Sequence, residues 1–453
     1  MKKITRRKAI STASAGIIGS MTLPLSSFEI NPGIQQKKLA LNGGEKIHAG
    51  TWPQWPVWDQ SAEESIIQML RSGKWWKGTG GALPDFEKNF AEMTGAKRCM
   101  VVSSGTAAHS ISLHALGIEA GDEVLTSAYT FRASYDVIFM ANALPVFIDT
   151  DPETFLMNTG KLEEKINDRT RAILPVHING LPVDMDSLNS VAKKHNLKVN
   201  EDACQANMAE YRGKKVGNLG DIGCFSFQNS KQMPAGEGGA IVGNDDEIMD
   251  RAYAFSDCDR VFDKTRSAEH KPSWAGNFRM QQSQALILLS QMKRTENDLN
   301  VRWENAQYLR SKLSGIPGIV PYKLANGATK AACYVYPFRY IAERFDNIPK
   351  QKFVQALVAE GIPCNAGTTS NLNGLTKIQE DLIERACNSR GFKRIFPESR
   401  LKQWREEMQL PGSAQAYREV VNMSQNVLLG SKSDMDDIVN AITKVYENRK
   451  SLA

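Results

Sequence analysis

Short apolar runs alternate with amphipathic stretches through the middle of the chain. Strand-like runs occur at residues 145–149, 172–176, 198–200 and 224–227. Between them, residues 185–195 repeat their apolar positions with the spacing of a helix that is buried on one face. This alternation predicts an α/β architecture, in which a mostly parallel sheet carries helices on both faces.

The pattern changes in the last third of the chain. A long helical pattern at 282–300 precedes a strand-like run at 333–340 and a second helical pattern at 350–360. A terminal helix is expected at 435–448. These elements predict a smaller α+β domain over residues 303–453, joined to the first domain by the long helix.

One lysine occupies the connection between two predicted strands, 224–227 and 240–242. Lys231 lies there, just before the glycine-rich turn 236–239. An amine shielded from water by apolar residues stays nucleophilic, as Schiff-base chemistry with an aldehyde requires. Glycine also permits positive φ angles and a close approach of backbone to a ligand. The alternative interpretation is a surface hairpin with an incidental lysine.

An acidic residue follows another predicted strand. Residues 197–200 lead into Glu201 and Asp202. In parallel α/β sheets, ligands bind at the carboxyl ends of strands. A carboxylate there can keep the pyridine nitrogen of pyridoxal phosphate protonated, which lets the ring accept electrons. Alternatively, Asp202 caps a helix N-terminus. His177, which follows the strand at 172–176, either contacts a ligand or is a hydrogen-bonded histidine of the core.

A phosphate site is predicted where a strand meets a helix. The run 100–103 is followed by the small residues 104–106 and a helical pattern at 107–116. A helix N-terminus presents free N–H groups and a positive dipole end to an anion. Many strand-helix turns share this pattern, so it is weakly specific. Phe131, after the strand at 123–125, is suited either to stacking on a flat ring or to the core.

Taken in order, these motifs resemble the DegT/DnrJ/EryC1/StrS family of pyridoxal-phosphate aminotransferases, the sugar and cyclitol enzymes of fold type I. The resemblance extends from about Leu39 to Tyr446. No single motif is specific, but the ordered set is. The set comprises residues 104–108, 121–124, 145–149, 175–177, 201–206, 220–227, Lys231, 236–239 and 276–280.

The resemblance implies a fold and a set of contacts to the cofactor ring. The fold is a large domain (33–302), with a mostly parallel sheet of the seven-stranded type flanked by helices, and a smaller C-terminal domain. Lys231 would form the Schiff base with pyridoxal 5′-phosphate, and Asp202 would pair with the ring nitrogen. Gln205 would lie near the ring hydroxyl, and Phe131 would stack on the ring.

The resemblance also implies a phosphate site shared between two subunits. Gly105, Thr106 and Ser226 would hold the phosphate within one chain. Asn277 matches the family residue that reaches the phosphate of the neighbouring subunit. Because the same surface must then both give and receive Asn277, a homodimer with shared active sites is expected.

The function implied is transfer of an amino group from glutamine or glutamate to a keto-sugar or keto-cyclitol. Some family members carry histidine instead of the lysine and act as sugar 3-dehydratases, so Lys231 favours transamination. Residues 39–44, 52–56 and 72–78 resemble the branch with the scyllo-inosose aminotransferases and the 3-amino-5-hydroxybenzoate synthases. Residues 361–369 lack the Tyr-x-Pro-x-His pattern expected of nucleotide-sugar enzymes.

Two other functions are compatible with the fold. An aminodehydratase of the 3-amino-5-hydroxybenzoate synthase type would use the same lysine and cofactor. A non-catalytic regulatory protein would keep the fold without the chemistry. The presence of Lys231, Asp202 and Gln205 together argues against the regulatory protein, because a scaffold needs none of them.

Charge and cysteine content limit the partners. The chain has 453 residues and a net charge of +6, but residues 2, 3, 6, 7 and 8 supply five positive charges, which leaves +1 (6 − 5) for the rest. A chain without a global basic field is not expected to bind nucleic acid. The seven cysteines are scattered without close pairing, so no disulfide framework is predicted.

The N-terminus resembles a signal for export. Arg6 and Arg7 precede an apolar run at 10–25 that is rich in serine, glycine and alanine. Residues 1–32 therefore resemble a twin-arginine (Tat) signal, which exports folded proteins to the periplasm. The apolar run is too short and too polar to predict a membrane span. The alternative is a basic tail on a cytoplasmic enzyme.

Overall fold

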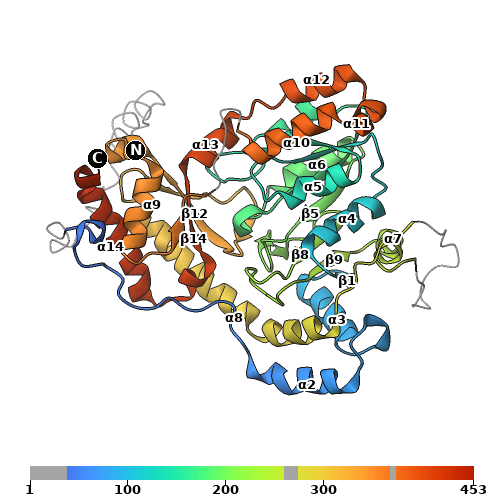
Figure 1. Ribbon diagram of the computed structural model, residues 1–453, viewed down its shortest axis with the longest axis horizontal. Coiled ribbons are helices and arrows are strands. Elements are labelled where there is room, and N and C mark those ends of the chain that lie inside the picture. Colours follow the sequence, from blue (N-terminus) through green and yellow to red (C-terminus); the bar gives the residue numbers. More distant parts are fainter. Residues whose placement is uncertain (1–37, 260–273, 368–373, 453) are drawn as a thin grey trace, which may run out of the picture. The chain divides into compact units, whose positions relative to one another are not determined.

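A computed structural model describes residues 38–259, 274–367 and 374–452. The predicted export signal at 1–32 lies outside these ranges, as do the last two residues of the 361–369 segment. Within the described ranges the strands form sheets of seven, four and three members (Figure 1).

The seven-stranded sheet confirms the predicted α/β core. Its strands run in the order β1-β9-β8-β5-β4-β2-β3, and β9 alone is antiparallel to its neighbours. Strands β2, β3, β8 and β9 are buried at every position, as expected of a sheet covered on both faces. The strands are β1 (Arg98–Val102), β2 (Glu123–Ser127), β3 (Leu144–Ile148), β4 (Thr170–Leu174), β5 (Lys198–Asp202), β8 (Ile222–Ser226) and β9 (Gly239–Gly243).

Helices flank this sheet (Figure 1). Helix α4 packs against β8 and β9, and α3 packs against β1. The side chain of Ser104 caps α4 by accepting a hydrogen bond from the Ala107 N–H at 3.0 Å. The helices of this part are α2 (Glu63–Ser72), α3 (Ala82–Thr94), α4 (Gly105–Ala115), α5 (Ala133–Met140), α6 (Met185–Lys194) and α7 (Asp246–Ser256).

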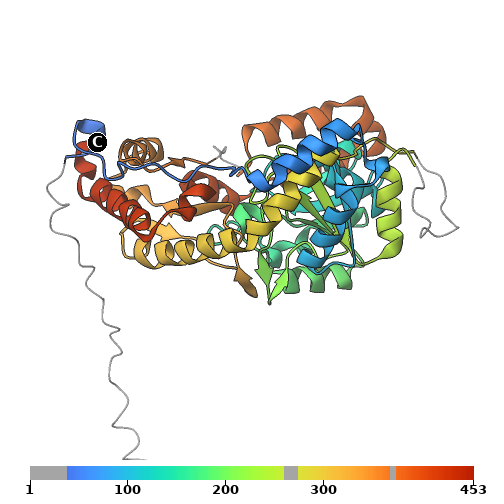
Figure 2. The same ribbon diagram turned by 90° about the horizontal axis from the view of Figure 1, so that it is seen from below.

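Helix α8 (Gln282–Leu313) is longer than the predicted 282–300. Figure 2 shows it running from the helices of the large sheet to the four-stranded sheet. Its second half stays helical because Leu309 and Leu313 are fully buried against the C-terminal elements. The predicted boundary at 302/303 therefore falls inside a continuous helix. Among the described helices, none is both long and apolar enough to span a bilayer.

The four-stranded sheet matches the smaller strand-rich region that was predicted. It is antiparallel, in the order β10-β12-β14-β13; α9 packs against β13, and α14 packs against α8 and α9. A three-stranded sheet, β11-β6-β7, pairs strands that are far apart in the sequence. The bounds are β6 (Glu210–Tyr211), β7 (Lys214–Lys215), β10 (Ile319–Pro321), β11 (Ala328–Lys330), β12 (Val335–Tyr340), β13 (Cys364–Asn365), β14 (Val420–Ser424), α9 (Lys350–Ala359) and α14 (Lys432–Glu447).

Four further C-terminal helices pack against the large sheet, an arrangement that the sequence pattern did not predict. Arg400 pairs with the buried Glu123 of β2 at 2.6 Å. The indole N–H of Trp404 donates to the Pro145 carbonyl of β3 at 2.9 Å. These contacts cover the edge of the sheet at β3, an edge that would otherwise expose unpaired backbone groups. The helices are α10 (Lys377–Asn388), α11 (Arg390–Ile395), α12 (Glu398–Glu406) and α13 (Pro411–Glu419).

Candidate active site

A cavity of about 410 Å³ opens at the carboxyl ends of β5 and β8. Ligands of parallel α/β sheets bind at this edge. The structure brings seven of the eight predicted site residues together there. They are Gly105, Thr106, Phe131, Asp202, Gln205, Ser226 and Lys231.

Asn277, the eighth predicted residue, lies elsewhere. It is exposed, does not line the cavity and forms an isolated antiparallel bridge with Asp257. The next residue, Phe278, accepts a hydrogen bond from the Ser103 N–H at 2.7 Å, which fastens this segment just beyond β1. Asn277 therefore contributes nothing to the cavity of its own chain, and its role toward a neighbouring subunit stays a prediction.

The start of α4 forms a notch at one wall of the cavity. The first N–H groups of a helix have no acceptor within the helix, and Gly105 and Thr106 occupy these positions. Gly105 is required because a Cβ there would lie 2.8 Å from Cys204 Sγ and 2.9 Å from Ser226 Cβ. This close packing leaves a small polar pocket at a positive helix end, a geometry suited to a phosphate.

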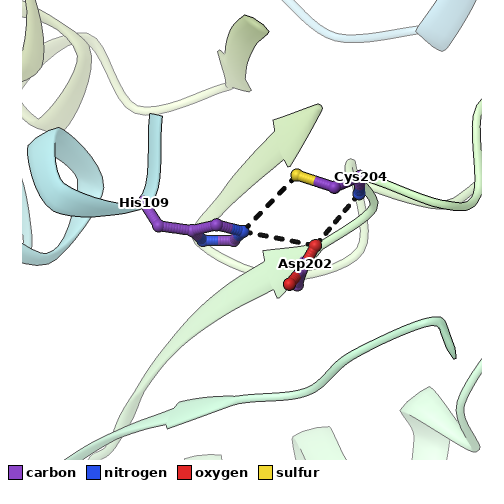
Figure 3. A group of neighbouring side chains, drawn as sticks. All are labelled: His109, Asp202 and Cys204. Carbon is purple, nitrogen blue, oxygen red and sulfur yellow. Dashed lines mark hydrogen bonds and ion pairs between the residues drawn. The ribbon is translucent and has the colours of Figure 1, made fainter. Parts of the chain in front are cut away.

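Asp202 ends β5 and accepts three hydrogen bonds, of which Figure 3 shows the two from His109 and Cys204. Its Oδ1 accepts from His109 Nε2 at 3.2 Å and from the Cys204 N–H at 3.0 Å. Its Oδ2 accepts from the Ser134 hydroxyl at 2.7 Å. Asp202 does not cap a helix N-terminus, since its side chain bonds across the cavity wall to α4 and α5.

The environment keeps Asp202 ionised. Burial alone would raise the pKa of its carboxyl, but the His109 charge and the bonds from His109, Ser134 and the Cys204 N–H hold that pKa below its usual range. Burial also acts to lower the pKa of His109, yet the charge of Asp202 and its hydrogen bond with His109 raise that pKa well above its ordinary value. The two groups therefore form a buried ion pair.

Gln205 presents its amide nitrogen to the cavity wall. Its Oε1 accepts a hydrogen bond from the Asn179 N–H at 2.8 Å, which fixes the orientation of the amide. Its backbone carbonyl accepts from Gln232 Nε2 at 2.7 Å. The side-chain NH₂ is thus the group available to an acceptor on a ligand, such as a ring hydroxyl.

Lys231 is half-buried, and three distant segments hold its turn. The indole N–H of Trp55 donates to the Lys231 carbonyl at 3.0 Å. Gln425 donates to the Ser230 carbonyl, and the Ser230 hydroxyl lies 3.0 Å from the hydroxyl of Tyr334. Lys231 Nζ sits 4.3 Å from the centroid of the Tyr334 ring. Lys231 is therefore part of the cavity wall and does not belong to an incidental surface hairpin.

The positions of Phe131 and His177 show which of the two predicted environments, cavity or core, each side chain has. Phe131 is 63% exposed at the cavity, so it is not a core residue. His177 is fully buried, donates from Nε2 to Glu201 at 3.0 Å and accepts from the Val183 N–H at 3.0 Å. It is a hydrogen-bonded core histidine.

The fold and the cavity together define a transferase of the aminotransferase class. A half-buried lysine and an ionised aspartate face one cavity, beside a helix N-terminus, on a seven-stranded α/β sheet. The DegT/DnrJ/EryC1/StrS aminotransferase family model matches residues 57–374, and the chain belongs to that family. It is therefore an enzyme, and the non-catalytic alternative is excluded. Aminotransferases of this family depend on pyridoxal phosphate.

The chain is also similar to individual aminotransferases and to solved structures. The chain is 31% identical to the L-glutamine:2-deoxy-scyllo-inosose aminotransferase of Streptoalloteichus tenebrarius, over 91% of this chain and 99% of the relative. It is 31% identical to the L-glutamine:scyllo-inosose aminotransferase of Streptomyces griseus, over 92% and 99%. Among solved structures, it resembles a 3-amino-5-hydroxybenzoic acid synthase with 27% identity and a TM-score of 0.74, over 90% and 100%.

Proposed function

We propose that this enzyme binds pyridoxal 5′-phosphate and transfers an amino group from glutamine or glutamate to a keto-cyclitol or a related keto-sugar. The observation that carries the proposal is the placement of Lys231 and Asp202 on one cavity beside the α4 N-terminus. The long similarity to two inosose aminotransferases supports the cyclitol as acceptor and glutamine as donor.

The residues of the cavity fit this cofactor. The notch at Gly105 and the helix N-terminus suit the phosphate, and Ser226 adds a hydroxyl beside them. The ionised Asp202 suits a protonated ring nitrogen, and Gln205 offers a donor to the ring hydroxyl. Bound pyridoxal phosphate would supply an electron-accepting ring, which stabilises negative charge on the carbon next to the transferred nitrogen.

Three residues of the protein would have separate roles in the reaction. Lys231 would hold the cofactor covalently, and its Nζ would then remove the proton from the α-carbon of the amino donor as a general base. Asp202 would keep the ring nitrogen protonated throughout. The exposed Phe131 would cover one face of the ring.

The lysine assignment has a direct test. Borohydride reduction of the yellow protein should fix the cofactor to the peptide that contains Lys231, as mass spectrometry would detect. Lys231→Ala should abolish both the linkage and turnover with the fold intact, because no other amine replaces the nucleophile. Lys214→Ala changes an exposed lysine of β7 and should behave as wild type. Linkage to a different lysine would overturn the proposal.

Aminodehydration is the second candidate, supported by the resemblance to the 3-amino-5-hydroxybenzoic acid synthase. Both reactions would use Lys231, so cofactor spectra cannot separate them. The mass of the product can, because transamination of a keto-cyclitol replaces the carbonyl oxygen with an amine and keeps every hydroxyl. A product that has also lost water would favour the lyase.

We also propose export of the folded protein to the periplasm through the Tat route. Arg6 and Arg7 followed by the apolar run at 10–25 support this proposal. Residues 1–35 fused to a reporter that is active only after folded export should give exported activity. Replacing both arginines with lysine should abolish it. Export that survives this change, or no export, would support the cytoplasmic alternative.

A further inference from the structure

A buried histidine behind Asp202 is not among the residues that the resemblance assigns to the cofactor. His109 lies on α4, one turn after the predicted phosphate notch, and is 1% exposed. Its ring points at Asp202 and Cys204 (Figure 3). Charged or polar rings are costly to bury in an otherwise apolar helix face unless a partner compensates.

The hydrogen-bond donors around Asp202 leave one acceptor position open. A carboxylate offers about four lone-pair positions. His109 Nε2 and the Cys204 N–H use two on Oδ1, and the Ser134 hydroxyl uses one on Oδ2. The fourth position belongs to Oδ2, so the protein itself selects the oxygen that is left for a ligand in the cavity.

The chemistry of the contact fixes the proton on His109. An ionised carboxylate only accepts hydrogen bonds, so Nε2 carries the proton that Asp202 receives. His109 Nδ1 is buried and has no hydrogen-bond partner among the described residues. The ring contacts two groups through Nε2, Asp202 Oδ1 at 3.2 Å and, at the longer distance of 3.6 Å, Cys204 Sγ.

The neighbouring thiols do not compete for this role. Burial and Asp202 raise the pKa of the Cys204 thiol to about 12, so it stays neutral. Cys224 on β8 donates its S–H to Asn200 at 3.3 Å. Besides this pair, the charged residues that line the cavity are Lys231 and Glu237. Asp202 is therefore the anion that His109 faces.

We propose that His109 is a positioning residue for Asp202: its Nε2–H keeps the carboxylate ionised and turns the free position of Oδ2 into the cavity. This inference rests on the proposed function, because the cavity is taken to receive a protonated ring nitrogen. His109 would act on the cofactor only through Asp202. An apolar residue at 109 would leave a buried carboxylate with two donors and a free position on Oδ1 instead.

The first test uses the protein without cofactor. In protein labelled with ¹⁵N-histidine, long-range ¹H–¹⁵N spectra show which ring nitrogen carries the proton. The signal of His109 is assigned as the one of six histidine signals that is missing in His109→Gln. We expect Nε2 of His109 to carry a proton throughout, and the His109 ring to stay doubly protonated to a higher pH than the ring of His114 on the same helix, whose pKa is lowered by burial and by Arg251 of α7. A proton on Nδ1 alone would overturn the proposal.

The second test measures the pyridoxal phosphate that the protein binds. His109→Leu should weaken binding about ten- to a hundredfold, because Asp202 loses one of the donors that keep it ionised and oriented toward the ring nitrogen. It should also shift the pH dependence of the bound cofactor's absorption. His109→Gln, which restores a donor, should recover most of both effects. His114→Gln is the matched control on α4 and should change neither.

Two outcomes of the second test are decisive. If Leu and Gln at 109 behave alike, His109 acts through packing alone and the proposal is wrong. If the wild type binds no pyridoxal phosphate, the proposed function fails, while the histidine spectra still decide whether His109 donates to Asp202. Thermal melting of each variant separates loss of binding from loss of fold.

Discussion

Two opposite charges, those of Asp202 and His109, meet in the wall of the cavity. Asp202 could be predicted because it follows a strand whose carboxyl end is where ligands bind, and Lys231 because it lies in the glycine-rich connection between two strands. His109 and Ser134 could not. His109 sits at a helical position whose neighbours are apolar, and its partner is 93 residues away along the chain, so periodicity gives no sign of the contact.

The ion pair makes a prediction about acid stability at this scale. Asp202 has a lowered pKa in the fold, so its contribution is present above its unfolded value of about 4 and is lost as the pH falls toward the folded value. His109 has a raised pKa, so its contribution is complete below about 6.5 and fades as the pH rises through the folded value. Both contributions are therefore complete between about pH 4 and 6.5.

Chemical unfolding of the cofactor-free protein at several pH values would check this. The wild type should exceed His109→Leu in its free energy of unfolding by the largest amount inside that window, and by less on both sides. His114→Gln should show no such maximum. A difference that does not vary with pH would mean that the pair does not exchange protons as described.

Single elements were predicted well, and their long-range packing was not. The apolar runs gave β3, β4 and β8 within a few residues, because fully buried parallel strands are short and continuous in apolar character. The sequence did not reveal that α12 covers the edge at β3, since the contact between Arg400 and Glu123 joins residues 277 apart. Helix α8 was predicted too short because its second half is buried by elements that come later in the chain.

The α4 notch predicts the effect of one methyl group. Gly105→Ala would place a Cβ 2.8 Å from Cys204 Sγ and 2.9 Å from Ser226 Cβ, so the wall must shift into the phosphate position. We expect pyridoxal phosphate affinity to fall about tenfold or more, which corresponds to at least ~1.4 kcal/mol. Fluorescence titration of the cofactor-free protein would measure it.

Gly391→Ala is the matched control for this change. Gly391 lies in α11, and a Cβ there would meet no atom within 4 Å. Its affinity for the cofactor should equal that of wild type, and the helix should gain slightly in stability. Equal affinities for both variants would show that the notch does not hold the phosphate.

At the scale of the whole molecule, the exposed Asn277 is the residue through which the predicted homodimer with shared sites can be tested. Asn277→Ala should bind pyridoxal phosphate about ten- to a hundredfold more weakly, since a hydrogen bond to a charged phosphate is lost. In a mixed dimer of Lys231→Ala and Asn277→Ala chains, one site would carry both defects and the other neither.

Mixing the two variants therefore has a defined outcome. Tight cofactor binding and borohydride linkage should reappear in the mixture, up to one intact site per mixed dimer. Sedimentation should show a dimer throughout. A fully active monomer, or no recovery after proven subunit exchange, would contradict the shared site.

The three contacts around the Lys231 turn also impose an order in time. Trp55 and Lys231 are 176 residues apart, and Ser230 and Gln425 are 195 apart. At roughly 5–20 residues per second of synthesis, Gln425 leaves the ribosome about 10–40 s after Ser230. The sheet can form in that interval, but the turn that carries Lys231 still lacks its hydrogen bond from Gln425. A nascent chain that ends before Gln425 should therefore hold pyridoxal phosphate weakly, which makes cofactor attachment a final step of biosynthesis.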